Sequence, residues 1–306
     1  MASVATHEAL VGGAVTHHPP GRAGFLGTVS SEFTKIRSVR STYWTLFALV
    51  VVCVGIGALF SWGQTERLLS IAQGTTINGR PLPHAQIAQI LASRRAEIRS
   101  TATAISLFGL LLGQLVIVVL GALSITTEYS TGMIRTSLTA MPRRGTLYAA
   151  KGVVFGVVAL VTGLVTSFLA FFVGQAILST QNVNTTLGHP GVLRAVVGGG
   201  LFLAVCGLLS FGIGAMLRHS AGAIATGIGL MFVLTILTNF LPGPPSGWFG
   251  QADIDKWIPF FAGGHIWQDQ MVGINPFSPW VGFGVFCAYT AAAVLGGLVL
   301  FLRRDA

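Results

Sequence analysis

Six apolar stretches recur along the chain, and each is long enough to cross a lipid bilayer as a helix. A bilayer core about 30 Å thick needs about 20 apolar residues in helical conformation. No Asp, Glu, Lys or Arg occupies the middle of any stretch. The pattern therefore predicts an all-α, polytopic membrane protein with six transmembrane helices. They are predicted over about 43–62, 103–126, 152–178, 195–217, 221–241 and 280–302.

The segment before the first span predicts a helix lying on the inner membrane surface. Residues 29–41 place apolar side chains three or four positions apart and interleave them with basic ones, as an interfacial helix requires. The residues concerned are Val29, Phe33, Ile36 and Val39, with Lys35, Arg37 and Arg40 between them. Residues 1–28 have no apolar core and predict a disordered cytoplasmic tail. Residues 29–306 are then expected to form a single transmembrane domain with six spans.

Two further segments lie between spans on the predicted outer side. Residues 63–100 read as a polar loop whose second half, 83–100, has helical spacing. Its Arg94–Arg95 pair is interpreted as a solvated face, or as a contact for lipid headgroups or an anionic substrate. Residues 242–279 are aromatic, polar and broken by proline. They predict short re-entrant helices before the last span, which are tolerated where protein covers the backbone.

Basic residues indicate the orientation in the membrane. If the N-terminus lies inside, eleven of the 18 Lys and Arg fall in inner segments and seven in outer ones. Inner loops of membrane proteins carry the excess of Lys and Arg. Both termini are therefore predicted to be cytoplasmic.

Composition supports a membrane protein and excludes large soluble domains. Only 9% of the 306 residues are charged and 52% are hydrophobic, whereas a soluble domain carries about 25% charged residues. Most of the outer surface must therefore face lipid. The net charge of +9 comes from residues that flank apolar runs, so nucleic acid is not an expected partner.

The motifs of common enzymes are absent from the sequence. There is no GxxxxGK[ST] phosphate loop, no HExxH and no GxSxG. We therefore expect no catalytic, cofactor-binding or metal-binding residues and no enzymatic activity on this chain. The spans also lack the ionisable group that ion-coupled transporters usually need. If the protein moves a substrate against a gradient, the energy is expected to come from a partner.

The inner loop between spans two and three, residues 127–150, is the most informative segment. Two polar residues follow the second span, Gly132 allows a turn, and an amphipathic stretch ends at basic residues. A short helix with apolar knobs can fit a groove on another protein; the alternative is a plain basic linker. The predicted docking residues are Glu128, Tyr129, Gly132, Ile134, Arg135, Leu138, Met141, Arg143 and Arg144.

Two runs of the sequence resemble a known family. SEFTKIRSVRSTYWT (residues 31–45) and TEYSTGMIRTSLTAMPRRGTLYAAK (residues 127–151), together with SPW at 278–280 and RRDA at 303–306, resemble bacterial ABC transporter permeases of the type-2 exporter class. The resemblance extends from about residue 29 to residue 306.

The resemblance implies a role for each segment. The helix carrying Phe33, Lys35, Ile36, Arg37 and Arg40 would be the connecting helix of such permeases. The stretch around 128–144 would be a coupling helix seated on a separate P-loop ATPase subunit, which would bind ATP and Mg. Two permeases, either two copies or a copy and a paralogue, would form a dimer in the bacterial plasma membrane, with substrate passing between them.

Two other functions remain open from the residues alone. A secondary transporter would work without any ATPase. A non-transporting membrane scaffold would tolerate loss of the charge pattern in the inner loop.

Overall fold

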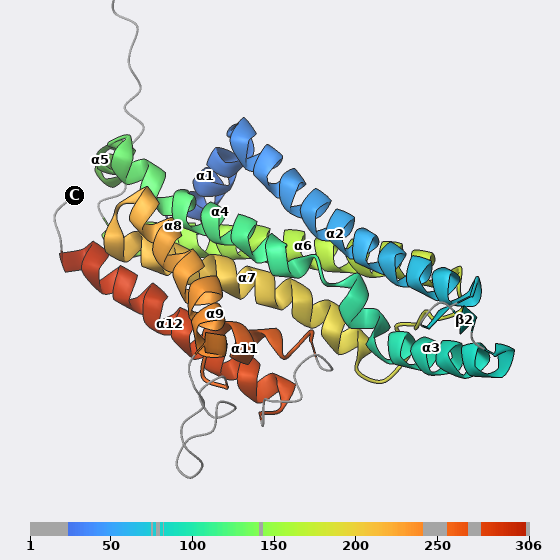
Figure 1. Cartoon of the computed structure of the whole chain (residues 1–306). Helices are drawn as coiled ribbons and strands as arrows, with labels where there is room; N and C mark the ends of the chain where they lie inside the picture. The colour runs from blue at the N-terminus through green and yellow to red at the C-terminus, as the bar shows by residue number, and fades with distance from the viewer. Residues whose placement is uncertain are drawn as a thin grey trace, which may run out of the picture.

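The protein is an elongated bundle of helices with two distinct ends (Figure 1). The computed structural model describes residues 24–74, 76–77, 80–81, 83–140, 143–240, 256–268 and 277–303. Six helical segments within these ranges are long and apolar enough to cross a membrane, which confirms the predicted number. One end of the bundle carries α1, α5 and the last turns of α12 and is called the α5 end. The opposite end carries α3 and a small hairpin and is called the α3 end.

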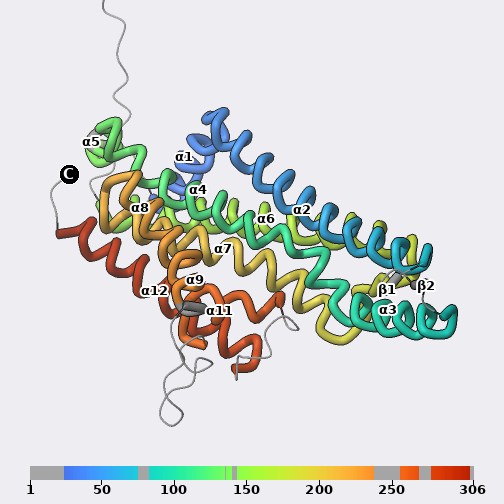
Figure 2. Tube along the Cα trace, in the orientation of Figure 1, coloured from blue at the N-terminus to red at the C-terminus, as the bar shows by residue number. Residues whose placement is uncertain are grey.

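The elements follow one another in a simple order, with one two-stranded antiparallel hairpin as the only strands of the described residues (Figure 2). They are α1 (Phe25–Ser38), α2 (Arg40–Ala72), β1 (Thr76–Ile77), β2 (Arg80–Pro81), α3 (His84–Ser106), α4 (Leu110–Ser130), α5 (Met133–Ala140), α6 (Arg144–Ser179), α7 (Val192–Leu217), α8 (Ser220–Ile228), the π-helical turn η1 (Gly229–Val233), α9 (Leu234–Phe240), α11 (Pro259–Gly264) and α12 (Pro279–Arg303).

The helices at the α3 end are longer than the apolar stretches predicted. Helix α2 continues for ten residues beyond position 62, and α3 leads into α4 with a break over 107–109. Residues 63–72 of the predicted polar loop are therefore helical, and the expectation of a loop was wrong for them; the helix expected over 83–100 is confirmed by α3. Once a helix leaves the hydrocarbon, polar side chains replace apolar ones while the backbone hydrogen bonds continue.

The two segments expected to lie at the membrane surface differ in how far they are described. Helix α1 begins four residues before the predicted start at 29 and ends at Ser38, where the extended backbone of Val39 separates it from α2. In the outer segment, α11 is a short buried helix that packs against α12. Residues 241–255 and 269–276 lie outside the described residues, and the re-entrant helices expected over 242–279 stay a prediction.

Helix α7 is the centre of the bundle and packs against α4, α6 and α12. The glycines of α7 allow this close packing, because backbone atoms of the neighbouring helices occupy the space that a side chain would fill. A Cβ on Gly212 would lie 2.6 Å from the carbonyl carbon of Ala293 in α12. Gly121 of α4 meets Gly207 of α7 in the same way. Small residues at helix crossings are the usual means of tight packing in membranes, since lipid provides no hydrophobic driving force between helices.

The Gly121–Gly207 contact generates a prediction about stability. Gly121→Ala places a Cβ against the Gly207 carbonyl oxygen, and overpacking of this kind costs about 1–3 kcal/mol. The thermal unfolding midpoint in detergent is expected to fall. The control is Gly55→Ala, where no atom lies within 4 Å of the added Cβ and alanine favours the helix by about 1 kcal/mol. Equal midpoints for the two variants would contradict the close approach.

Candidate functional site

Four charged side chains from three helices gather at the α5 end. Glu32 and Lys35 come from α1, Glu128 from the last turns of α4, and Lys151 from the first turns of α6. Lys151 Nζ lies 2.6 Å from Glu32 Oε2 and 2.5 Å from Glu128 Oε1. Lys35 Nζ contacts the same Glu128 oxygen. We call these four residues the four-charge cluster.

The cluster is largely shielded from solvent. The side chains of Lys151, Glu128 and Glu32 are 3%, 5% and 9% exposed, and only Lys35 reaches the surface, at 29%. Removing an unpaired charge from water costs several kcal/mol, so such groups are stable only when paired with good geometry. Two ammonium groups and two carboxylates give a net charge of zero, which satisfies this condition for the group as a whole.

The local sequence explains why these side chains converge. Glu32 and Lys35 are three residues apart on α1 and therefore share one face. Thr28, one turn before Glu32, is buried on the same helix, and this face packs against α6. The opposite face leaves Leu26 and Phe33 exposed, as expected of a helix that rests on a membrane. Helix α1 is thus amphipathic, but its buried face is polar and charged.

A cavity of about 370 Å³ borders the cluster between α1, α2, α4 and α6. All four cluster residues line it, together with apolar residues of α4, α6 and α7 that include Leu120 and Phe155. The second carboxylate oxygen of Glu128 is buried and has no hydrogen-bond partner among the described residues. Ion pairs therefore hold the ends of α1, α4 and α6 together around the cluster, and close packing does so only in part.

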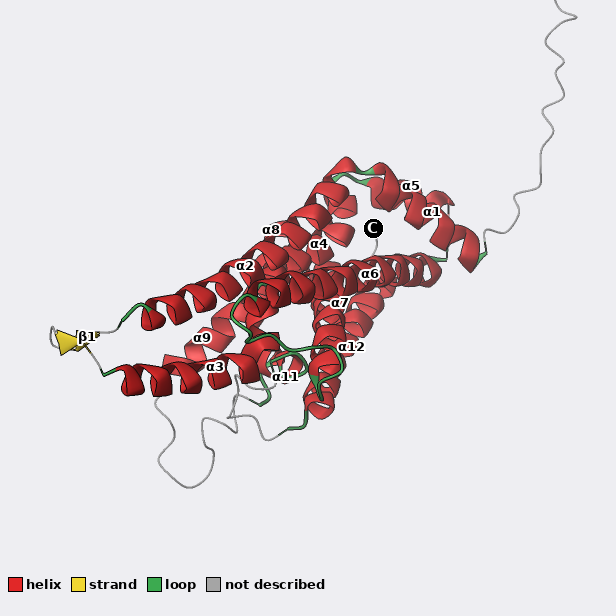
Figure 3. Cartoon of the chain, turned by 90° about the vertical axis from the view of Figure 1, so that its right-hand side faces the viewer, coloured by secondary structure: helices red, strands yellow, loops and turns green. Residues whose placement is uncertain are grey.

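Helix α5 lies beside this cluster, at the same end of the bundle as α1 (Figure 3). Gly132 adopts a left-handed φ of 71° between α4 and α5, which confirms the turn predicted there, because glycine enters this region without steric cost. Ile134 is buried in the main core and Leu138 packs against it. Met133 is 44% exposed. The inward side chains hold α5 to the bundle, and Met133 also borders the cavity beside the cluster. Thr136, on the side of α5 away from Ile134, is exposed.

Further contacts tie the end of α4 to the remaining helices. The guanidinium of Arg218, at the end of α7, lies 5.0 Å from the ring centroid of Tyr129. The same side chain donates a hydrogen bond to the backbone of α12 at Leu300. The hydroxyl of Tyr148 donates to the carbonyl oxygen of Val294, also in α12. Displacement of α4 at this end would therefore reach α7 and α12.

The predicted docking residues occupy different environments. Glu128 lies inside the four-charge cluster and not on the open surface, since Lys35 and Lys151 surround its carboxylate. Ile134 and Leu138 face the bundle, and Tyr129 is half-buried. Gly132 and Arg143 are exposed and Arg144 is half-buried. The side chain of Arg135 and residue Met141 lie outside the described residues. On α1, Phe33 and Arg37 are exposed and Ile36 lines the cavity. Arg40 is exposed but begins α2, so its predicted place on the surface helix was wrong.

Sequence reasoning missed Glu32 and Lys151 as site residues. In the sequence pattern, Lys151 contributes only to the excess of basic residues on the predicted inner side of the membrane. A usable signal was present, because the chain has three lysines and nine acidic residues. A lysine at the start of an apolar run needs a carboxylate near it in the folded protein. Glu32 precedes the first apolar span and Glu128 follows the second, so each carboxylate lies at the same predicted side of the membrane as Lys151.

Comparison with known proteins identifies the family. A family model described as ABC-2 family transporter protein matches residues 28–306. The chain belongs to this family. No curated protein matches the chain. An ABC-2 transporter of this kind is a multi-pass permease, a membrane component of transport that is generally non-catalytic and normally works with an ABC ATPase. The family resemblance predicted from the two sequence runs is thereby confirmed.

Lys151 gives the sharpest test of the four-charge cluster in this permease. Lys151→Met leaves two buried carboxylates against one lysine, and breaking a buried ion pair on one side costs about 3–5 kcal/mol. The unfolding midpoint is expected to fall well below that of the unaltered protein. As a control, Glu97→Ala breaks the exposed pair with Arg94, which is worth less than about 1 kcal/mol.

A double variant separates charge from packing. Lys151→Met with Glu32→Gln restores neutrality and keeps the Lys35–Glu128 pair. It is expected to recover part of the loss, so that the two changes are not additive. Strictly additive losses in the same unfolding assay would show that the cluster does not act as one unit.

Proposed function

We propose that this chain is the membrane-spanning subunit of an ATP-driven ABC exporter in a bacterial plasma membrane. Its α5 end faces the cytoplasm and couples to a separate ATPase subunit, which binds ATP and Mg. Two permeases, identical or paralogous, form the translocation pathway between them. The observation that carries the proposal is the four-charge cluster, which joins a surface helix to both spans that flank the α5 loop.

The first supporting step is mechanical. Helix α5 lies between α4 and α6, separated by two residues from the end of α4 and by three residues from the start of α6, so a partner that pushes on α5 acts on the ends of both spans. The cluster links the same two ends through Lys151 and Glu128. Because Glu32 and Lys35 add α1 to this link, the surface helix would move with the spans. To couple the ATPase to the spans, α1 and α5 must pass on a displacement without changing shape themselves. Packed elements that switch between two discrete arrangements transmit displacement in this way.

The second step concerns the surface available to the ATPase. Ile134 and Leu138 anchor α5 from inside, which leaves Gly132, Met133 and Arg143 open to a partner. Arg135, Met141 and Arg144 complete the proposed docking surface from the sequence pattern. An apolar knob flanked by basic side chains suits a groove with an acidic rim on the ATPase.

The orientation follows from the same arrangement. Arg37 and Arg40 are exposed at the junction of α1 and α2, and Arg143 is exposed beside α5. These basic side chains share the α5 end, which is the distribution expected of a cytoplasmic face. The apolar side chains of Leu26 and Phe33 would then rest in the inner leaflet.

Co-purification tests the proposed coupling. The tagged permease is expressed with the genes that neighbour its own, extracted in mild detergent, and assayed for bound ATPase subunit and ATP hydrolysis. A P-loop ATPase is expected in about equal amount. Met133→Glu with Arg143→Glu places two negative charges on the docking surface and is expected to lower its recovery about tenfold, equivalent to 1.4 kcal/mol.

The matched control is Arg95→Glu, an exposed charge change at the α3 end, which should leave recovery unchanged. A stable oligomer without ATPase that still transports would favour a secondary transporter. A stable oligomer that neither transports nor hydrolyses ATP would favour a scaffold. Either outcome would overturn the proposal.

A further inference from the structure

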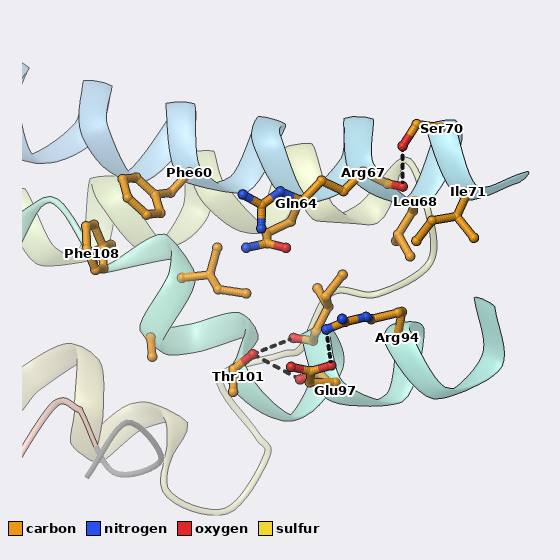
Figure 4. A pocket seen from close by; sticks show the side chains of 13 residues that line it. Phe60, Gln64, Arg67, Leu68, Ser70, Ile71, Arg94, Glu97, Thr101 and Phe108 are labelled. Carbon is orange, nitrogen blue, oxygen red and sulfur yellow. Dashed lines mark hydrogen bonds and ion pairs between the residues drawn. The ribbon is translucent and has the colours of Figure 1, made fainter. Parts of the chain in front are cut away.

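A second cavity lies at the α3 end, in the groove between the extension of α2 and the length of α3 (Figure 4). Its volume is about 420 Å³. The charged lining side chains lie toward one end of the groove, among apolar ones such as Leu68 and Ile98, and the other end is lined by apolar side chains. The lining side chains include Phe60, Gln64, Arg67, Arg94, Ile105 and Phe108.

The apolar end of the groove lies toward the bilayer. The rings of Phe60 and Phe108 stack there with centroids 3.8 Å apart, and Ile105 lies beside them. Phe60 belongs to the apolar stretch predicted to span the membrane, and Trp62, two residues on, is 56% exposed. Exposed tryptophan prefers the headgroup level. This part of the groove therefore lies near the boundary between hydrocarbon and headgroups.

The polar end of the groove carries an excess positive charge. Arg94 and Glu97 form an exposed ion pair of 2.8 Å and compensate each other. Arg67 has no carboxylate within ion-pair distance among the described residues. Figure 4 shows its side chain extending along the groove toward Gln64. The groove therefore has a net charge of +1, with the amide of Gln64 next to the uncompensated guanidinium.

The dimensions of the groove fit one amphiphile. Eleven residues separate Phe60 from Ile71, the lining residue furthest along α2, and a helix rises 1.5 Å per residue, which gives about 16 Å. That length accommodates a phosphate headgroup, a glycerol and the upper part of an acyl chain. Guanidinium groups bind phosphate oxygens through paired hydrogen bonds.

We propose that this groove binds an anionic phospholipid from the leaflet on the α3 side. Its phosphate lies between Arg67 and Arg94, and its acyl chain runs past Ile105 toward the Phe60–Phe108 pair. The bound lipid holds the projecting part of α2 against α3. The site is independent of the ATPase partner, because it lies at the opposite end of the bundle from α5.

Native mass spectrometry of the purified protein tests the site. The delipidated protein is incubated with phosphatidylglycerol or phosphatidylcholine, and the bound lipids are counted. The unaltered protein is expected to retain phosphatidylglycerol preferentially. Arg67→Ala with Arg94→Ala is expected to lower this retention about thirtyfold, because both basic side chains that face the lipid phosphate are removed.

Three results would overturn the assignment. The first is a double variant that retains as much phosphatidylglycerol as the unaltered protein. The second is a loss of phosphatidylglycerol in the control Arg95→Ala, on α3 but outside the groove, as large as that in the double variant. Displacement of the lipid by inorganic phosphate alone would show an anion site without lipid specificity. The double variant is expected to keep its ATPase recovery, so failure here is distinguishable from failure of the proposed function.

Discussion

The four-charge cluster is the constraint on which the α5 end depends, because charges buried at the end of a membrane bundle must be neutralised by one another. Lys151 pairs with Glu32 and Glu128 at 2.6 and 2.5 Å, so three helix ends meet at one ammonium group. Removing one of the four charges leaves one of the remaining charges in the cluster uncompensated. The positions of α1, α4 and α6 are therefore set by one electrostatic condition, while glycine-rich crossings of α7 set the packing of the rest.

This arrangement divides the permease into parts with different physical character. At the α5 end, ion pairs and hydrogen bonds to α12 connect helices that apolar contacts only partly join. In the middle, α7 packs backbone to backbone against its neighbours. At the α3 end, α2 and α3 leave the bilayer and enclose a groove with an excess positive charge. The four-charge cluster, the closely packed middle and the groove at the α3 end thus follow one another along the bundle.

The sequence predicted the spans well because lipid imposes a simple rule on side chains. The six apolar stretches, the surface helix preceding the first span and the turn at Gly132 all follow from local pattern. The extension of α2 beyond Trp62 did not, since a polar helix outside the bilayer has no apolar signature. Glu128 was expected at a docking surface but is buried beside Lys151 and Glu32. The ion pair between Glu32 and Lys151 joins residues more than one hundred positions apart, so no local sequence pattern can predict it.

The central claim is that α1 and the α5 loop move as one unit when the partner ATPase binds nucleotide. Double electron–electron resonance between two spin labels tests it. The native cysteines are replaced by alanine, and cysteines that carry the labels are introduced at the exposed positions Phe33 and Thr136. In the complex with the ATPase, a non-hydrolysable ATP analogue should leave the Phe33–Thr136 distance within one chain unchanged. It should shift the Thr136–Thr136 distance between the two permeases. A change within one chain as large as the change between chains would contradict the account.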